Sequence, residues 1–201
     1  MERGAKDLIA GVDEVGLGPL AGPVVAAAVI LDPGDLIEGL ADSKKLAPRA
    51  RERLAVEIFA RAKAFAVGRA SALEVDIFNV LVASHLAMRR AVQGLKTLPT
   101  QILVDGNKAP VLSVPVRAIV KGDQTIPEIS AASIIAKVVR DREMEVLADR
   151  YPSYQFSRHK GYPTPAHRKL LRQLGPTPIH RRSFGPVRKV MEQTSFVGDV
   201  G

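Results

Sequence analysis

The chain has 201 residues, no cysteine and a formal net charge of +8. Its length suits one domain or a domain with a small appendage, and its aliphatic-rich composition favours a layered α/β protein over a disordered chain. The lack of cysteine excludes disulfides and thiolate metal sites. The N-terminus does not resemble a signal peptide and no apolar run is long enough to cross a bilayer. We therefore expect a cytoplasmic protein with no membrane partner.

The positive charge is concentrated toward the C-terminus. From Arg150 to Met191 there is no Asp or Glu, but there are ten Lys or Arg residues and three of the four histidines. Such a block is typical of a solvated face, a membrane-surface patch or a nucleic-acid footprint. Six prolines in the block argue against a continuous amphipathic membrane helix, and its interleaved aromatic residues suit stacking on nucleotides. A nucleic-acid partner is favoured.

Two apolar runs near the N-terminus predict strands, at residues 7–10 and 23–31. The segment between them is rich in glycine and is expected to form a turn that exposes backbone N–H groups. This segment contains the adjacent acids Asp13 and Glu14. Two carboxylates beside a turn are unfavourable on a protein that binds polyanions, unless they hold a hard divalent cation such as Mg²⁺.

The rest of the chain alternates between helical and strand patterns. The expected elements, in chain order, are a helix at 48–63, a strand at 65–70, a short helix opened by the capping-box spacing of 71–74, a helix at 80–93, strands at 101–104 and 114–120, a helix at 128–150, and a helix opened by Thr164-Pro165 that ends at Gly175. This order predicts an α/β fold. We expect one compact unit, with a catalytic domain at 1–150 and a basic C-terminal helical extension at 151–201 packed on it.

Three aspartates share one sequence context. Asp13, Asp105 and Asp123 each lie at or just beyond an apolar strand and close to a glycine. Adjacent strand ends are where functional groups converge in α/β sheets. Carboxylates gathered there need cations to remain ionised together. Two Mg²⁺ or Mn²⁺ ions about 4 Å apart would meet that need and would suit a phosphodiester displacement.

Simpler interpretations remain open for each acid. Asp105 before a glycine and Asp123 after one are, taken singly, typical turn residues. Asp13 and Glu14 are adjacent, and adjacent residues of a regular strand face opposite sides of the sheet. They can share a site only if the backbone bends there.

Six segments resemble bacterial ribonuclease HII, in that family's order, and the resemblance spans the chain from Gly11 to Val190. The segments are Gly11–Pro23, Asp42–Leu46, Val104–Asn107, Lys121–Asp123, Pro127–Lys137 and His159–Thr164. The resemblance implies a ribonuclease H-like fold, with a central mixed sheet flanked by helices and a C-terminal helical extension. It also implies metal-dependent cleavage of the RNA strand of RNA–DNA hybrids, and cleavage at single ribonucleotides embedded in duplex DNA.

By that match, Asp13, Glu14, Asp105 and Asp123 are the catalytic, metal-binding carboxylates of a two-metal site that takes Mg²⁺ or Mn²⁺. The implied reaction is in-line attack of an activated water on the phosphate 5′ of a ribonucleotide, which leaves a 3′-hydroxyl and a 5′-phosphate. A site of carboxylates without an evident nucleophile suits such electrostatic catalysis. His159 is a rival proton-transfer residue, although a histidine in a basic loop is more often a phosphate contact or a structural donor.

Distinguishing RNA from DNA requires contacts to the 2′-hydroxyl. In the family, a glycine-flanked turn and a tyrosine sense the RNA-to-DNA junction, and the matching residues are Gly16, Leu17, Gly18 and Tyr162. One departure matters, because the family's turn is usually Gly-Arg-Gly. Leucine cannot make the charge-assisted phosphate contact of an arginine. We therefore expect reduced but not abolished activity.

Further substrate contacts are expected from polar and basic residues in two places. These residues are Ser43, Lys44 and Lys45, and Arg181 and Arg182 beside His180. Two alternatives to this function remain open from the sequence. One is a non-catalytic module that binds RNA–DNA hybrids, with the acids as turn residues. The other is a ribonuclease H-fold nuclease or strand-transfer enzyme that ignores the 2′-hydroxyl. The protein is expected to be a monomer.

Overall fold

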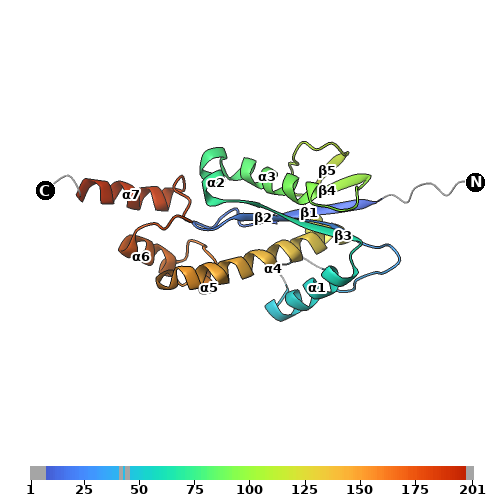
Figure 1. The fold of residues 1–201 in the computed structure, drawn as a ribbon, viewed down its shortest axis with the longest axis horizontal. Helices are drawn as coiled ribbons and strands as arrows, with labels where there is room; N and C mark the ends of the chain where they lie inside the picture. Colours follow the sequence, from blue (N-terminus) through green and yellow to red (C-terminus); the bar gives the residue numbers. More distant parts are fainter. Residues whose placement is uncertain (1–7, 41–42, 44–45, 198–201) are drawn as a thin grey trace, which may run out of the picture. The chain divides into compact units, whose positions relative to one another are not determined.

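The computed structural model describes residues 8–40, 43 and 46–197, with side chains up to residue 193. Its centre is a five-stranded sheet (Figure 1). The strands are β1 (Ile9–Val15), β2 (Val24–Ile30), β3 (Ala64–Ala70), β4 (Gln101–Asp105) and β5 (Val116–Ile119), in the order β3-β2-β1-β4-β5. Strand β1 is antiparallel to β2 and parallel to β4, and β4 is parallel to β5. The expected mixed sheet is confirmed.

Strand β1 is longer than the sequence predicts. It continues through Asp13 and Glu14 to Val15, so the predicted position of these acids in a turn is wrong. Asp13 is opposite Ala27 and Glu14 is opposite Ala26 in a regular antiparallel register. Pairing with β2 through Val15 outweighs the weak strand propensity of glycine and aspartate. The true turn therefore begins at Gly16.

Most of the expected helices are present. They are α1 (Pro48–Arg61), α2 (Ala72–Phe78), α3 (Val80–Gln93), α4 (Pro127–Arg150) and α6 (Pro165–Leu174). The predicted capping box of α2 is complete, because Ser71 and Glu74 each accept a backbone N–H of the other. The predicted ends of α6 are confirmed, since the Thr164 hydroxyl accepts from the His167 N–H and Gly175 has a φ of 70°.

The C-terminal helices are only partly foreseen. The sequence predicts a helical extension, but not the individual helices α5 (Phe156–His159) and α7 (Gly185–Val197). Two short 3₁₀ helices, η1 (Gly122–Gln124) and η2 (Pro152–Tyr154), were also not expected. These short or glycine- and proline-flanked segments lack a clear apolar period, and tertiary packing determines them.

The chain clusters into two compact units whose segments alternate along the sequence. The first contains residues 1–15, 25–69 and 84–138, and the second contains residues 16–24, 70–83 and 139–201. The core of the first unit includes strand β2, which is buried along its whole length. The second has apolar clusters around Leu20 and Phe156. The expected division at residue 150 stays a prediction.

In the first unit, helix α4 begins very close to β1. A Cβ atom on Gly11 would lie only 2.1 Å from the carbonyl carbon of Glu128, so only glycine fits at this crossing. Small buried residues follow at 130–133. This close approach places the first turns of α4 beside the residues that end β1. Among the described residues, no helix is both long and apolar enough to span a membrane.

Candidate active site

Three carboxylates converge in the first unit. Val12 of β1 is opposite Val104 of the parallel strand β4, so the following residues, Asp13 and Asp105, lie at the same level of the sheet. Asp123 belongs to η1, which follows β5. One carboxylate oxygen from each of these aspartates lies within 4.8 Å of the others. The aspartates at neighbouring strand ends thus meet as the sequence predicts, in an arrangement that could hold a metal ion.

The cluster is electrostatically strained without a cation. Asp13 and Asp123 are each only 5% exposed. Burial raises the pKa of the Asp13 carboxyl well above its usual value, and the charges of Glu14 and Asp105 raise it further. A hydrogen bond from the Ser133 side chain opposes part of this rise. A divalent cation would offset the repulsion and allow the carboxylates to ionise together.

Backbone and hydroxyl donors orient the aspartates. The Glu14 N–H donates to Asp13 Oδ1 over 2.7 Å, and the Asp123 N–H donates to Asp105 Oδ1 over 3.3 Å. The Ser130 hydroxyl donates to the Asp123 carbonyl over 2.5 Å. Outer hydrogen bonds of this kind fix the orientation of metal ligands. Ser130, in the first turn of α4, was not among the site residues predicted from the sequence.

Ser43 is linked to the aspartate cluster through Ser133. It is 3% exposed, and its Oγ lies 2.8 Å from Oγ of Ser133, which in turn hydrogen-bonds Asp13. The expectation that Ser43 contacts the substrate is therefore corrected, because its hydroxyl is buried and directed at Ser133. Lys44 and Lys45, expected beside it as phosphate contacts, lie outside the described residues.

The fourth predicted carboxylate is that of Glu14. It is half-buried, and regular alternation along β1 directs it away from Asp13. Its carboxylate is not part of the group of three. Its charge nevertheless raises the pKa of Asp13. Its role as a metal ligand stays a prediction.

In the second unit, the turn after β1 is held by Arg181. The Arg181 guanidinium donates to the carbonyls of Gly16, Leu17 and Gly22 over 2.7–3.1 Å. Arg181 has no exposed surface. Burial, and then the charge of Arg140, lowers its pKa to about 9, so it stays charged at neutral pH. The expected phosphate contact by Arg181 is therefore wrong, because its donors face the turn's carbonyl groups.

Arg140 holds the other end of the same turn and was not foreseen. It donates from Nε to Pro23 over 3.0 Å, from Nη2 to Ala21 over 3.3 Å and from Nη1 to Lys160 over 3.1 Å, in each case to a carbonyl. Its Nε would lie 2.4 Å from a Cβ on Gly16, a residue with a φ of 99°. Glycine is required there both by its backbone conformation and by this close contact. No local pattern marks Arg140, because two of its partners, Ala21 and Pro23, are 119 and 117 residues away in the chain.

Tyr162 lies beside this turn in the second unit. A Cβ on Gly18 would be 3.9 Å from Cε1 of Tyr162, and the Arg140 guanidinium lies 5.7 Å from the centre of the tyrosine ring. Tyr162 is 37% exposed and Leu17 is 40% exposed. Tyr162 is thus a neighbour of the turn, and the side chains of Leu17 and Tyr162 are accessible. Their function stays a prediction.

Three histidines form a buried network behind Tyr162. Thr177 N–H donates to His180 Nδ1 over 3.0 Å, so the His180 proton is on Nε2, which lies 3.1 Å from His167 Nε2. His167 must therefore donate from Nδ1 to the Tyr162 carbonyl, over 2.9 Å. Burial is the main cause that lowers the pKa of His167 to about 4 and that of His180 to about 3. Both rings are neutral at pH 7.

His159 completes the network and is engaged on both sides of its ring. Its Nδ1 accepts the Gly161 N–H over 3.2 Å, and its Nε2 donates to the Tyr154 carbonyl over 2.7 Å. These bonds favour the structural interpretation of His159 over proton transfer. Arg182 is exposed, while its backbone N–H donates to Asp76. A phosphate contact by the Arg182 side chain stays a prediction.

Comparison with known proteins identifies the family. The family model "Ribonuclease HII" matches residues 10–187. The ribonuclease H2 of Pyrococcus horikoshii OT3 is 31% identical and has a TM-score of 0.78, with 93% of this chain and 98% of that chain covered. The RNase HII of Archaeoglobus fulgidus, in a structure of its complex with PCNA, is 29% identical with a TM-score of 0.68, covering 87% of this chain and 93% of that one.

A more distant likeness extends to ribonuclease HIII. Bst-RNase HIII in complex with Mn²⁺ is 20% identical, with a TM-score of 0.68, and the match covers 94% of this chain and 70% of that chain. At that identity the likeness shows the fold alone. The family match, the neighbours and the aspartate cluster agree with the ribonuclease H-like fold expected from the sequence. The chain belongs to the ribonuclease HII family and is a ribonuclease H, a metal-binding endonuclease of a family that acts on RNA–DNA hybrids.

Proposed function

We propose that this protein cleaves the RNA strand of RNA–DNA hybrids and also cuts duplex DNA 5′ of a single embedded ribonucleotide, leaving 3′-hydroxyl and 5′-phosphate ends. The observation that supports it most is the convergence of Asp13, Asp105 and Asp123 within 4.8 Å. Three oxygen ligands in a partly buried cluster suit Mg²⁺ or Mn²⁺, which prefer carboxylates and retain sites for water and phosphate oxygens.

The carboxylates would hold the metal in this proposal. Asp13, Asp105 and Asp123 supply the central ligands, and Glu14, the residue after Asp13 on β1, is a fourth candidate ligand. When bound there, two divalent cations would supply activation of a water and neutralisation of charge on the phosphate and the departing 3′ oxygen. The protein's own part is to keep the aspartates oriented through Ser133 and through the N–H groups of Glu14 and Asp123. No side chain needs to act as a nucleophile.

The ribose is sensed, in this proposal, by the turn Gly16-Leu17-Gly18 and by Tyr162. Gly18 leaves room for a sugar beside the tyrosine ring, and the exposed phenol can hydrogen-bond a 2′-hydroxyl. Arg181 supports the turn from inside, so the backbone groups on its outer side are held in place. Arg182, Lys44 and Lys45 remain candidate phosphate contacts.

Leu17 should weaken this protein relative to members of its family with arginine at that position. A leucine side chain supplies no charge to a phosphate. Arg181 donates to the carbonyl of Leu17, so the turn keeps its backbone shape whether leucine or arginine stands at position 17. Substrate affinity therefore falls while the chemistry is retained.

The deciding experiment is a cleavage assay on duplex DNA that contains one ribonucleotide, with Mg²⁺ or Mn²⁺. We expect a cut 5′ of the ribonucleotide, with no cut in the all-DNA duplex of the same sequence. Asp13→Asn should remove the cut, since it removes a ligand with little change of shape. Cleavage of the all-DNA duplex would show that the 2′-hydroxyl is not read. Binding without cutting by the unaltered protein would contradict the proposal.

A further inference from the structure

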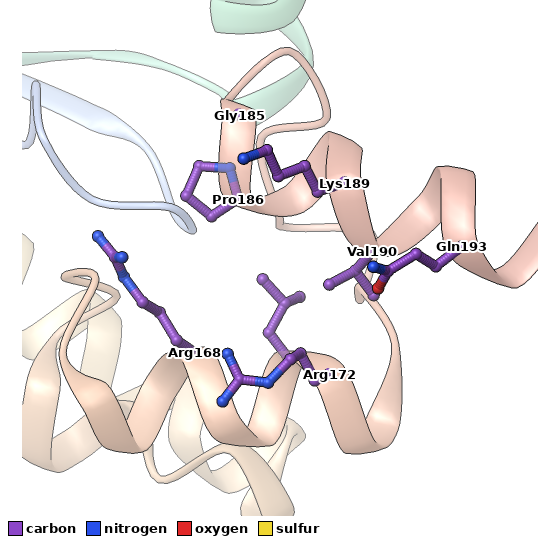
Figure 2. Close-up of a pocket in the computed structure, with 8 residues that line it drawn as sticks. Arg168, Arg172, Gly185, Pro186, Lys189, Val190 and Gln193 are labelled. Carbon is purple, nitrogen blue, oxygen red and sulfur yellow. The ribbon is translucent and has the colours of Figure 1, made fainter.

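A basic cleft lies between helices α6 and α7 of the second unit. Its volume is about 340 Å³. It is lined by Arg168, Leu171 and Arg172 of α6 and by Gly185, Pro186, Lys189, Val190 and Gln193 of α7. In Figure 2 the Arg168 side chain rises from α6, the Arg172 side chain lies along α6, and the Lys189 side chain extends along α7 toward the end that contains Gly185 and Pro186. None of these residues belongs to the site proposed above.

The charge lining the cleft is of one sign. Arg168, Arg172 and Lys189 are exposed cations, and the described residues that line the cleft include no carboxylate. Glu192 lies on α7 but points to Arg188, 3.8 Å away, which is outside the lining. Like charges facing one another across a cleft repel, unless an anion occupies the space between them. The cleft therefore has the charge of an anion-binding site.

The floor of the cleft is apolar and fixed. Leu171 and Val190 are buried in a cluster with Val187 and with Leu20, which belongs to the turn after Gly16. The basic side chains are thus carried by two helices that are packed on a common core. Side chains on rigid helices lose less entropy on binding than side chains on a loose tail.

The same cluster ties the cleft to the Tyr162 segment. Arg168 Nε donates to the Pro163 carbonyl over 3.1 Å, directly after Tyr162, and the Leu20 N–H donates to Gly161 over 2.8 Å. Arg172 lies one helical turn beyond Arg168 on α6. Arg168 and Arg172 therefore form a row of cations along α6 that begins beside the segment containing Tyr162.

We infer that the cleft between α6 and α7 binds the phosphate backbone of the nucleic-acid substrate, with Arg172 and Lys189 as the contacts. This inference rests on the proposed function and adds a second anchoring site to it. The planar guanidinium of Arg172 suits bidentate contact with a phosphate, and Lys189 adds a point charge from the opposite wall. Backbone contacts of this kind position a duplex without reading its sequence. The spaced cations favour a polyanion over one small anion.

The test compares two double variants with the same loss of charge on the same helices. Arg172→Ala with Lys189→Ala removes the cleft cations, while Lys169→Ala with Arg188→Ala removes exposed cations that do not line it. Binding to a ribonucleotide-containing duplex is measured by fluorescence anisotropy at several salt concentrations, without divalent metal. We expect the plot of log affinity against log salt to be less steep for the cleft variant, with the magnitude of its negative slope smaller by about 1.8, since each phosphate contact contributes about 0.9. The control slope should stay near that of the unaltered protein.

Equal slopes for the two double variants would overturn the inference, because net charge alone would then explain the binding. With an all-DNA duplex, the cleft variant should show the same decrease in the magnitude of the salt slope, since a contact with the phosphate backbone does not depend on the ribose. A third arm uses inorganic phosphate. If phosphate raised the melting temperature of the unaltered protein more than that of the cleft variant, while the salt slopes of the two double variants were equal, the cleft would be a site for free anions instead. Binding is measured without cleavage, so a failure of the cleavage assay contradicts the proposed function and leaves this test standing.

Discussion

The Arg181 guanidinium donates to the carbonyl oxygen of Leu17 over 3.0 Å, although the two residues are 164 positions apart. Arg181 thereby fixes the backbone at Leu17 through its carbonyl, while the Leu17 side chain is 40% exposed. Backbone position and side-chain identity at this residue are therefore separable. Substitution of Arg181 changes the support of the backbone, and substitution of Leu17 changes the side chain.

Leu17→Arg should increase activity. The turn keeps its conformation, and the new guanidinium gains a charge-assisted phosphate contact worth about 1.5–3 kcal/mol. That corresponds to an increase of about tenfold or more in kcat/KM on a single-ribonucleotide duplex, expressed mainly as a lower KM. The salt slope of binding should steepen by about 0.9. Leu17→Gln, which adds length without charge, is the control, and equal cleavage rates for Leu17→Arg and the unaltered protein would refute the role of this position.

Arg181→Lys should damage the turn even though the charge is kept. A lysine has one donor atom where Arg181 donates from three nitrogens to three carbonyls. Each buried carbonyl left without a partner costs about 1–3 kcal/mol. We expect a lower free energy of unfolding in denaturant titrations and poorer discrimination between ribonucleotide and all-DNA duplexes. Arg182→Lys, at the exposed neighbour, should leave the free energy of unfolding unchanged; a loss equal to that of Arg181→Lys would contradict the role given to the buried guanidinium.

The aspartate cluster could be predicted because its cause is local. An aspartate at or just beyond an apolar strand and close to a glycine was visible three times in the sequence, and neighbouring strand ends bring such residues together. The capping box at Ser71 and the limits of α6 were predicted for the same reason. Each of these features depends on residues within a few positions of one another.

The roles of Arg140 and Arg181 could not be predicted, because their partners are distant in the chain. Within a basic block, a buried arginine cannot be told from a solvated one by composition. Arg181 was therefore assigned to a phosphate, while the structure directs it to backbone carbonyls. The extent of β1 was missed for a related reason, since the pairing partners of Asp13 and Glu14 in β2 decide it and not their own propensity.

Asp13→Asn should make the protein more stable without metal and insensitive to metal. Burial and the neighbouring carboxylates raise the pKa of Asp13, so its ionised form is unfavourable in the folded protein at neutral pH. A neutral amide removes that cost. In the unaltered protein, Mn²⁺ at 100 times its Kd should add about 2.7 kcal/mol to the free energy of unfolding, and this gain should be lost in the variant. Cleavage should fall by about 100-fold or more, because the metal supplies several kcal/mol of transition-state stabilisation.

The control for this variant is Asp149→Asn, which changes an exposed carboxylate of α4 outside the cluster. Thermal unfolding with and without Mn²⁺ gives the measurement. An unaltered protein whose melting temperature ignores Mn²⁺, or an Asp13→Asn variant that responds to it fully, would exclude Asp13 as a ligand.

The buried histidine pair should make the protein sensitive to mild acid. His167 and His180 have pKa values of about 4 and about 3 in the folded protein against 6.5 ordinarily. The unfolded chain therefore binds protons that the folded chain does not, so the free energy of unfolding falls as pH drops below 6.5, by up to about 1.4 kcal/mol per pH unit for each histidine. Denaturant titrations between pH 7 and 5 measure this slope. His180→Asn should remove about half of this pH dependence. The contribution of Asp13 is the same in the variant and in the unaltered protein. Identical pH profiles of the free energy of unfolding for the two proteins would show that His167 and His180 do not control acid stability.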